Sequence, residues 1–287
     1  MTTLRGLLER ALTHIWYERS VVSLGLLPLS LIVHMVIKRR RRKALPKGVT
    51  PEGVKVIIVG GLTVGGTGKT PILIALGSWL QSRGLRVGVL SRGYRSDVGD
   101  MPTTVLETHD ARQVGDEPLL IRRSLGAPVV VCRDRRRALD ALIEQEPIDV
   151  VLSDDGLQHY ALHRDIELIV IDGQQGLGNG RKLPAGPLRE ARERLVEADM
   201  VVVNGHLDSQ AEFATVSPEQ MSIRPTRFRH LQSGRCESVN SWLESHADKF
   251  KQVHAVAAIG NPQRFANTLS AMGLEVNLHR FDDHQAL

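Results

Sequence analysis

The sequence predicts an α/β protein in which a mainly parallel sheet is covered by helices. Short runs rich in Val, Ile and Leu alternate with helical stretches from Lys55 onward. The runs are continuously apolar, as strands must be when both faces of a parallel sheet are covered. Such alternation of strands and helices is typical of crossover connections. The expected strands are Lys55–Val59, Arg86–Leu90, Pro128–Cys132, Asp149–Leu152, Glu167–Ile171, Met200–Val203 and Val253–Ala257.

The chain of 287 residues is long enough for one large or two modest domains. We expect three parts. Residues 1–45 form an amphipathic and apolar N-terminal segment that ends in a basic stretch. Residues 46–225 form the main domain, and residues 226–287 form a second, smaller α/β domain.

Composition excludes several classes of protein. With 42% hydrophobic and 24% charged residues, the chain is neither disordered nor collagen-like. Cys132 and Cys236 are too far apart in sequence for a disulfide framework or a structural zinc site, and they suit a reducing cytosol. The net charge is +5, but every residue of Lys38–Lys43 is basic, so the rest is nearly neutral. This local patch does not indicate a nucleic-acid-binding protein, and no protein partner is predicted.

Residues 3–19 read as an amphipathic helix, because Leu4, Leu8, Leu12 and their apolar neighbours recur at helical spacing. Val21–Ile37 follows, a mostly apolar run that contains Pro28. As a helix this run spans about 25 Å, less than the roughly 30 Å hydrocarbon core of a bilayer.

A cleaved signal peptide does not fit the N-terminal segment, because the positive charge follows the apolar run. Three other interpretations stay open. An interfacial anchor, with the basic stretch on anionic headgroups, fits best and makes an anionic membrane surface a partner. A single span and a helical hairpin packed on the protein's own core, with its basic stretch solvated, are the alternatives. All three leave the main domain in the cytoplasm.

A Walker A-like phosphate-binding loop follows the first expected strand, although Thr63 replaces the usual leading glycine. Glycines let successive backbone N–H groups wrap phosphates, Lys69 reaches the β/γ oxygens, and Thr70 binds Mg²⁺. A helix expected from about Pro71 to Ser82 completes the strand–loop–helix context. The sequence thus predicts a P-loop NTPase-like fold that binds a nucleoside triphosphate. The motif comprises Thr63, Val64, Gly65, Gly66, Thr67, Gly68, Lys69 and Thr70.

The carboxylates that assist magnesium binding are expected at a strand end. Asp154 and Asp155, followed by Gly156, are preferred because paired carboxylates supply the oxygen ligands that Mg²⁺ favours. Asp172 ends another apolar strand, but it is equally typical of a turn residue. The chain has no Asn-Lys-x-Asp motif, which argues mildly against GTP.

Several further motifs occur in a fixed order, and together they are more specific than any one alone. With the P-loop and the apolar N-terminus, they resemble the tetraacyldisaccharide 4'-kinase family from about Ser20 to the end. The motifs are Ser91–Tyr94, Val114–Pro118, Asp154–His159, Gly178–Gly180, Leu183–Glu190 and Ile259–Phe265.

The resemblance implies an ATP- and Mg²⁺-dependent lipid kinase of lipid A biosynthesis. Such an enzyme transfers the γ-phosphoryl group of ATP to the 4'-hydroxyl of tetraacyldisaccharide 1-phosphate and forms lipid IVA. It works at the cytoplasmic face of the bacterial inner membrane, as a peripheral or monotopic protein, with two α/β domains that close over the nucleotide.

The resemblance also implies roles for single residues. Asp116 matches the catalytic base, which is the role that a carboxylate beside the γ-phosphate can fill. His284 matches its partner, and Arg189 joins Lys69 in neutralising phosphate charge. Glu190 joins Thr70, Asp154 and Asp155 at the metal. The residues matched to the acceptor side are Arg92, Tyr94, Arg135, Gln158 and His159.

Simpler interpretations accompany these roles. Asp116 is also well placed to cap a helix that starts near Glu117. Arg135 belongs to a run of three arginines of the kind that usually forms a solvated helix face. His284, taken alone, is more often a surface histidine than a catalytic one.

The chain also departs from the family pattern. Family members usually continue well past the motif that contains His284, whereas this sequence ends at Leu287. We therefore expect the second domain to be incomplete. The alternatives to a lipid kinase are a peripheral membrane P-loop ATPase without a lipid acceptor, a soluble small-molecule kinase, and a kinase that binds ATP but is inactive.

Overall fold

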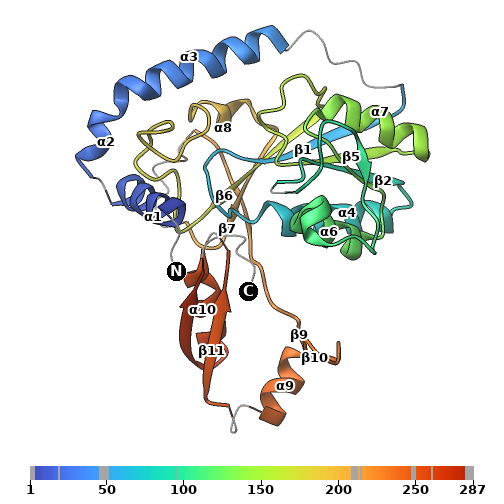
Figure 1. The fold of residues 1–287 in the computed structure, drawn as a ribbon, viewed down its shortest axis with the longest axis vertical. Coiled ribbons are helices and arrows are strands. Elements are labelled where there is room, and N and C mark those ends of the chain that lie inside the picture. The colour runs from blue at the N-terminus through green and yellow to red at the C-terminus, as the bar shows by residue number, and fades with distance from the viewer. Residues whose placement is uncertain are drawn as a thin grey trace. The chain divides into compact units, whose positions relative to one another are not determined.

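A computed structural model describes residues 4–18, 20–44, 52–94, 96–207, 213, 215–246, 250–259 and 261–281. The chain divides into two compact units, which are Thr13–Met221 and Ser222–Leu287 together with Met1–Leu12. Figure 1 labels most of the elements of the two units.

The larger unit is built on a sheet whose strand order is β3-β4-β2-β5-β1-β6-β7-β8. All neighbouring pairs are parallel except β3 with β4, which are antiparallel. The phosphate-binding strand β1 lies between β5 and β6, so the loops that follow these three strands meet at one edge. The strands are β1 Lys55–Gly61, β2 Val87–Ser91, β3 Thr103–Thr104, β4 Val129–Val131, β5 Val150–Asp154, β6 Ile166–Asp172, β7 Met200–Asn204 and β8 Glu219–Met221.

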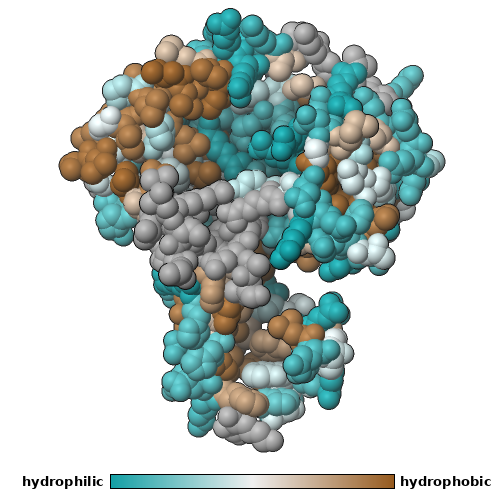
Figure 2. All heavy atoms as spheres, viewed as in Figure 1, coloured by the Kyte–Doolittle hydropathy of each residue, from teal (hydrophilic) through white to brown (hydrophobic). Residues whose placement is uncertain are grey.

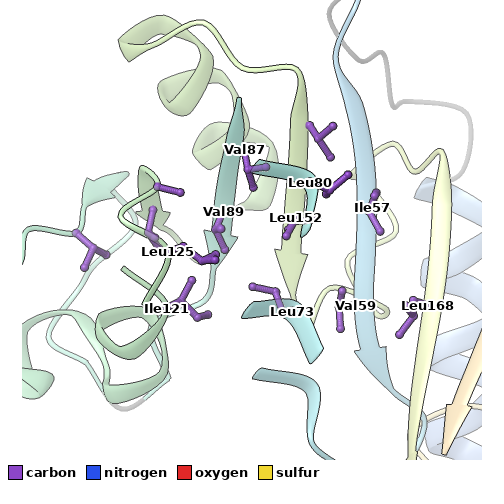
Figure 3. Close-up of a cluster of buried hydrophobic side chains, with 14 of the residues drawn as sticks. Ile57, Val59, Leu73, Leu80, Val87, Val89, Ile121, Leu125, Leu152 and Leu168 are labelled. Carbon is purple, nitrogen blue, oxygen red and sulfur yellow. The ribbon is translucent and has the colours of Figure 1, made fainter. Parts of the chain in front are cut away.

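Helices cover both faces of this sheet, as the continuously apolar strands predict. On one face, α4 and α6 pack against the strands around Leu73, Ile121 and Leu152 (Figure 3). On the other face, α7 packs around Leu142, and α8 contributes Leu195 to a third cluster. Each large aliphatic side chain buried in this way contributes about 1.5–3 kcal/mol. The helices of this part are α4 Lys69–Ser82, α5 Ala111–Val114, α6 Asp116–Leu125, α7 Arg135–Gln145 and α8 Arg194–Glu197.

The N-terminal segment forms three helices, α1 Leu4–Tyr17, α2 Val22–Gly25 and α3 Leu27–Ala44. The apolar run is interrupted at Leu26, and Pro28 falls in the first turn of α3, where proline is tolerated. From there α3 continues through the whole basic stretch. None of the described helices is both long and apolar enough to cross a membrane.

Polar contacts attach these helices to the larger unit. Trp16 Nε1 donates to the Pro184 carbonyl oxygen at 2.9 Å. The buried Ser30 hydroxyl donates to the Lys182 carbonyl at 2.8 Å and accepts from the Ala185 amide at 3.0 Å. In the basic stretch, Arg41 pairs with Glu197 on α8, whereas the other five residues of Lys38–Lys43 are exposed. The interfacial interpretation stays a prediction.

The smaller unit contains two further sheets. Strands β9 Arg227–Arg229 and β10 Cys236–Ser238 are antiparallel, whereas β11 Gln252–Ala257 and β12 Glu275–Arg280 are parallel. Helix α9 Val239–His246 follows β10, and α10 Pro262–Ser270 connects β11 to β12. Ala255, Leu269 and Leu274 form its buried cluster, with Phe228 and Trp242 packed against it.

Every strand that the sequence predicts is present, within a few residues of its expected bounds. The additional strands, β3, β8, β9, β10 and β12, were not expected. All except β12 are two or three residues long, too short for an apolar run to indicate them.

Candidate active site

The loop between β1 and α4 carries the predicted phosphate-binding motif, and its strand–loop–helix context is confirmed. Strand β1 ends at Gly61 and α4 begins at Lys69. Gly68, the N-cap of α4, has φ +98°, a conformation that glycine adopts without strain. The first amide groups of α4 have no partner within the helix, so this turn presents N–H donors and a positive helix end to an anion.

Neighbouring segments hold this loop in place. Asn204 Nδ2, at the end of β7, donates to the Thr67 carbonyl at 3.1 Å. The Val64 amide donates to the Pro187 carbonyl at 3.0 Å, and Thr63 forms a bridge with Leu188. The sequence analysis did not single out Asn204. Its only signal is a polar residue that ends an otherwise apolar strand.

Asp154 and Asp155 lie at the end of β5, next to the phosphate-binding strand. Asp154 is 2% exposed, and its Oδ2 accepts from the Ser91 hydroxyl at 3.1 Å. Its Oδ1 has no hydrogen-bond partner among the described residues. Burial and the neighbouring Asp155 raise the pKa of Asp154 against the opposing effect of Lys69.

Asp155 faces the cations of the site. It is the one described non-glycine residue with positive φ, at +47°, and its carboxylate lies 3.7 Å from Lys69 Nζ. Arg189 also contacts it, at 2.7 Å. Burial alone would raise the pKa of Asp155, but Lys69 and Arg189 outweigh it and lower the pKa to about 2. The carboxylate is therefore ionised at neutral pH.

A chain of hydrogen bonds continues from Arg189 to Glu190. Arg189 donates to Gln158 Oε1 at 3.3 Å, and Gln158 Nε2 donates to Glu190 Oε1 at 2.9 Å. The other Glu190 oxygen lies 3.2 Å from Arg194 Nε. The structure thus brings Lys69, Asp155 and the predicted pair Arg189–Glu190 into one continuous cluster.

The described residues contain no group of three or more His, Cys, Asp or Glu side chains suited to a metal ion. Glu190 is engaged by Gln158 and Arg194, and Asp155 by Arg189. Asp154 has an unpartnered buried oxygen, and Thr70 is buried in the first turn of α4. Mg²⁺ commonly takes one or two protein ligands beside substrate phosphates. Asp154 and Thr70 fit that role.

Asp116 is the first residue of α6, and the interpretation that it caps this helix is wrong. Gly115 is the N-cap, with φ +94°, and α6 receives no side-chain capping bond. The chain turns directly from α5 into α6 through Gly115, so the cap position precedes Asp116. Asp116 Oδ1 accepts instead from the adjacent Glu117 amide at 3.0 Å.

Glu117 is a site residue that the sequence analysis missed. Burial raises its pKa to about 7, with Asp154 adding to the effect and Lys69 opposing it. Glu117 therefore lies within electrostatic range of the P-loop lysine and the buried aspartate. A perturbed carboxylate in such a position is typical of functional sites, and its sequence signal was only its position after Asp116.

Arg135 is buried, so the interpretation of its arginine run as a solvated helix face is wrong for this residue. It begins α7, and its guanidinium donates to the carbonyls of Cys132 at 3.0 Å and Asp154 at 2.8 Å. Asp134 caps α7 and turns the first helical side chain inward, toward the end of β5. Burial lowers the pKa of Arg135 to about 10, so it remains charged at neutral pH.

The other residues matched to the acceptor lie close to this region. Arg92 and Tyr94 are exposed on the loop after β2, and a Cβ on Gly115 would lie 3.4 Å from the Tyr94 carbonyl. His159 is half-buried; burial, then Arg135 and Arg92, lower its pKa to about 4. His159 is therefore neutral at pH 7.

Two other predictions need separate mention. His284 lies outside the described residues. Asp172 is a strand-end turn residue, as one interpretation held, because its Oδ1 accepts from the amides of Gln174 at 2.9 Å and Gln175 at 3.2 Å.

Comparison with known proteins gives a consistent result. The family model described as "Tetraacyldisaccharide-1-P 4'-kinase" matches residues 22–287. A tetraacyldisaccharide 4'-kinase of Stutzerimonas stutzeri is 47% identical over 271 residues, which cover 94% of this chain and 78% of the relative. One from Alcanivorax borkumensis is 46% identical, with 94% and 79% covered.

A solved structure is also similar. It is the crystal structure of an "apo" form of LpxK from Aquifex aeolicus, in complex with ATP. The TM-score is 0.71 with 28% sequence identity, over 92% of this chain and 83% of that chain. The similarity therefore includes the fold as well as the sequence.

Proposed function

The chain belongs to the tetraacyldisaccharide 4'-kinase family, and from this premise we propose how its residues carry out the reaction. The protein is a kinase that transfers the γ-phosphoryl group of ATP to the 4'-hydroxyl of tetraacyldisaccharide 1-phosphate. Its product is lipid IVA, in lipid A biosynthesis. The observation that carries the assignment to this site is the junction of the P-loop with the Asp155–Arg189 pair.

ATP is bound by the loop Thr63–Thr70, with its β- and γ-phosphates at the start of α4. Lys69 and Arg189 neutralise the charge on the transferring group, because both already lie around Asp155. Thr70 and Asp154 would hold Mg²⁺, whereas Asp155 and Glu190, the other two predicted ligands, are paired with Arg189 and Arg194. The ion would screen the charge of the β- and γ-phosphate oxygens.

Asp116 is the general base. Its carboxylate accepts the proton of the 4'-hydroxyl while that oxygen forms a bond to the γ-phosphorus and the bond to the β-phosphate oxygen breaks, which releases ADP. Asp116 is exposed and adjoins Glu117, whose pKa is raised in part by Asp154 and lowered by Lys69. His284 is proposed to orient Asp116, on the family pattern alone.

The acceptor binds on the side of Arg92, Tyr94 and His159. Arginine suits the 1-phosphate of the acceptor, because its guanidinium binds phosphate through two N–H groups. A neutral His159 can exchange hydrogen bonds with a sugar hydroxyl. Both terminal nitrogens of Arg135 donate to carbonyl groups, so Arg135 supports the site by fixing the end of β5. Gln158 links Arg189 to Glu190 beneath the acceptor.

We propose that α2 and α3 attach the protein to the cytoplasmic face of the inner membrane. Large apolar side chains are exposed along them, among them Val21, Leu31 and Met35, which is 61% exposed. Figure 2 has this apolar surface beside a strongly hydrophilic one at the top of the view. An apolar face next to a basic stretch suits an interface with anionic lipid. We propose residues 1–45 as the membrane segment, residues 46–225 as the kinase domain and residues 226–287 as the second domain.

The test is phosphoryl transfer from γ-labelled ATP to tetraacyldisaccharide 1-phosphate in mixed micelles. Lys69→Ala serves as the blank, and Asp116→Asn should lower kcat by about 10²–10⁴-fold, the range for loss of a general base. Asp140→Asn, an exposed aspartate on α7, is the matched control and should leave kcat unchanged. Labelled lipid in the Lys69→Ala sample, or full activity of Asp116→Asn, would contradict these roles.

A further inference from the structure

Arg194, which no motif singled out, lies at the centre of a buried group of carboxylates. It is the first residue of α8 and is 4% exposed. Its NH2 donates to both oxygens of Glu167, at 2.8 and 2.7 Å. Its Nε lies 3.2 Å from Glu190, and its NH1 donates to Glu197 at 2.8 Å. Glu167 and Glu190 are buried with Arg194, whereas Glu197 is 46% exposed, so removal of Arg194 would leave two buried carboxylates without this cation.

Glu167 anchors this arginine to the central sheet. It lies on β6, opposite Ile58 of the phosphate-binding strand. It also pairs with Arg164, which donates to the carbonyls of Leu157 at 3.1 Å and His159 at 2.8 Å. The same carboxylate therefore ties together Arg194 and the loop that carries Gln158 and His159.

Glu190 is held from two sides. Arg194 contacts Oε2, while Oε1 accepts from Gln158, which in turn accepts from Arg189. Glu190 is 3% exposed, so its carboxylate is enclosed by these partners. Arg194 places its positive charge beside Oε2 as an ion pair, so the direction of the Glu190 carboxylate depends on Arg194.

We propose that Arg194, anchored by Glu167, is a positioning residue that fixes Glu190 for phosphoryl transfer. It touches neither ATP nor acceptor and acts through Glu190 and the Gln158–Arg189 pair. The inference rests on the proposed function of Glu190 in the site. It extends that proposal to a residue outside every motif of the sequence analysis.

A double-mutant cycle on the full chain tests this, with kcat, KM for ATP and the half-saturating Mg²⁺ concentration as readouts. Arg194→Lys keeps the charge but loses the fixed geometry of the guanidinium. It should lower kcat about tenfold, with KM for ATP within twofold, because small misplacement of a catalytic group is costly. In a Glu190→Gln background the same change should cost less than twofold, because residues that act as a unit are not additive.

Two controls separate positioning from stability. Arg86 and Asp149 form an exposed ion pair immediately before β2 and β5. Arg86→Lys alters this pair and should not couple to Glu190→Gln. Glu167→Gln leaves Arg194 in place but loosens its anchor, so it should lower kcat as Arg194→Lys does and also couple to Glu190→Gln. This variant carries the test if Arg194→Lys does not fold, as judged by thermal denaturation.

The outcomes are distinguishable. Equal losses from Arg194→Lys in the wild-type and Glu190→Gln backgrounds would overturn the positioning role and leave the proposed function intact. An unchanged kcat for Glu190→Gln would overturn the role of Glu190 and, with it, this inference. Coupling above fivefold in kcat, with Arg86→Lys additive, supports it.

Discussion

One terminal nitrogen of Arg189 donates to both carboxylate oxygens of Asp155, at 2.9 and 2.7 Å. Lys69 Nζ approaches the same carboxylate at 3.7 Å. Asp155 therefore holds two cations at the point where the P-loop meets the end of β5. Because the positions of these cations are fixed by the fold, their charge is available to a transferring phosphoryl group without reorganisation.

Asp155→Asn should lower kcat by about 10²–10³-fold, the usual cost of losing one preorganised electrostatic group. It should also change acid stability. The folded pKa of about 2 lies below the ordinary value of 3.8, so the ionised group stabilises the fold above pH 4, and this contribution is lost as pH falls toward 2. Because the side chain is 32% exposed, we expect about 1 kcal/mol.

Urea unfolding at pH 6 and pH 3 measures this. The difference in unfolding free energy between the wild type and Asp155→Asn should shrink at the lower pH. A difference that stays constant would mean that Lys69 and Arg189 do not depress the pKa of this group.

Gly68→Ala should abolish ATP binding, because the surrounding loop has little room to move away from the added Cβ. At φ +98° any side chain is strained, and the added Cβ would overlap Asn204 Nδ2 and lie 2.8 Å from Met221 Cε. Gly126→Ala is the matched control, because Gly126 has φ +64° but nothing within 4 Å of the added Cβ. Calorimetric titration measures the affinity of both variants for ATP. Gly126→Ala should bind ATP as the wild type does, and an equal affinity for Gly68→Ala would show that the loop accommodates the added Cβ.

The α/β fold and the P-loop could be predicted because short, contiguous stretches of sequence indicate both. The strands around Val59 and Ile169 are mostly apolar, and the motif Thr63–Thr70 is contiguous. Resemblance to the family then selected Arg189 and Glu190, which the structure brings together with Gln158. Nothing in the local pattern around these two residues alone would have done so.

What the sequence could not indicate depends on tertiary contacts. Arg135 looks like a surface residue, but Asp134 caps α7 beside β5 and turns it inward. The raised pKa of Glu117 comes first from burial and then from Asp154, which is remote in sequence. Asn204 supports the loop by donating a hydrogen bond to the Thr67 carbonyl from the end of a strand remote in sequence. These relationships join residues that are remote in sequence, so no motif with a fixed spacing could indicate them.

Glu117→Gln should stabilise the protein at alkaline pH. A carboxyl whose pKa is raised to about 7 from 4.5 is destabilised in its ionised form by the fold, so stability falls as pH rises from 4.5 through 7. A neutral glutamine removes this penalty, which we expect to be about 1–2 kcal/mol at pH 8 after allowing for partial exposure. At pH 4.5 the penalty is almost absent.

Denaturant unfolding of wild type and Glu117→Gln at pH 4.5 and pH 8 checks the sign. The stability advantage of the variant should grow between the two values. Glu107→Gln, an exposed glutamate just before α5, is the control and should give the same difference at both. An advantage for Glu117→Gln that did not depend on pH would place its effect in packing, not in ionisation.

Attachment of α3 to anionic membranes should depend on its apolar face and on its basic end separately. Leu31 is 62% exposed and Met35 lies one helical turn further along the same helix, also exposed. Replacing both with glutamate removes two apolar side chains from the interface and adds negative charge, so co-sedimentation with vesicles that contain anionic lipid should fall more than tenfold.

Replacing Arg39 and Arg40 with glutamine should weaken binding at low salt but little at high salt, because about 1 kcal/mol per charge is screened there. Leu106→Glu, at a leucine that is half-exposed elsewhere in the larger unit, adds a negative charge away from α3 and should leave binding intact. If the Leu31 and Met35 variant bound as well as the wild type while the arginine variant lost all binding, attachment would be electrostatic and the apolar face of α3 would have to serve another purpose.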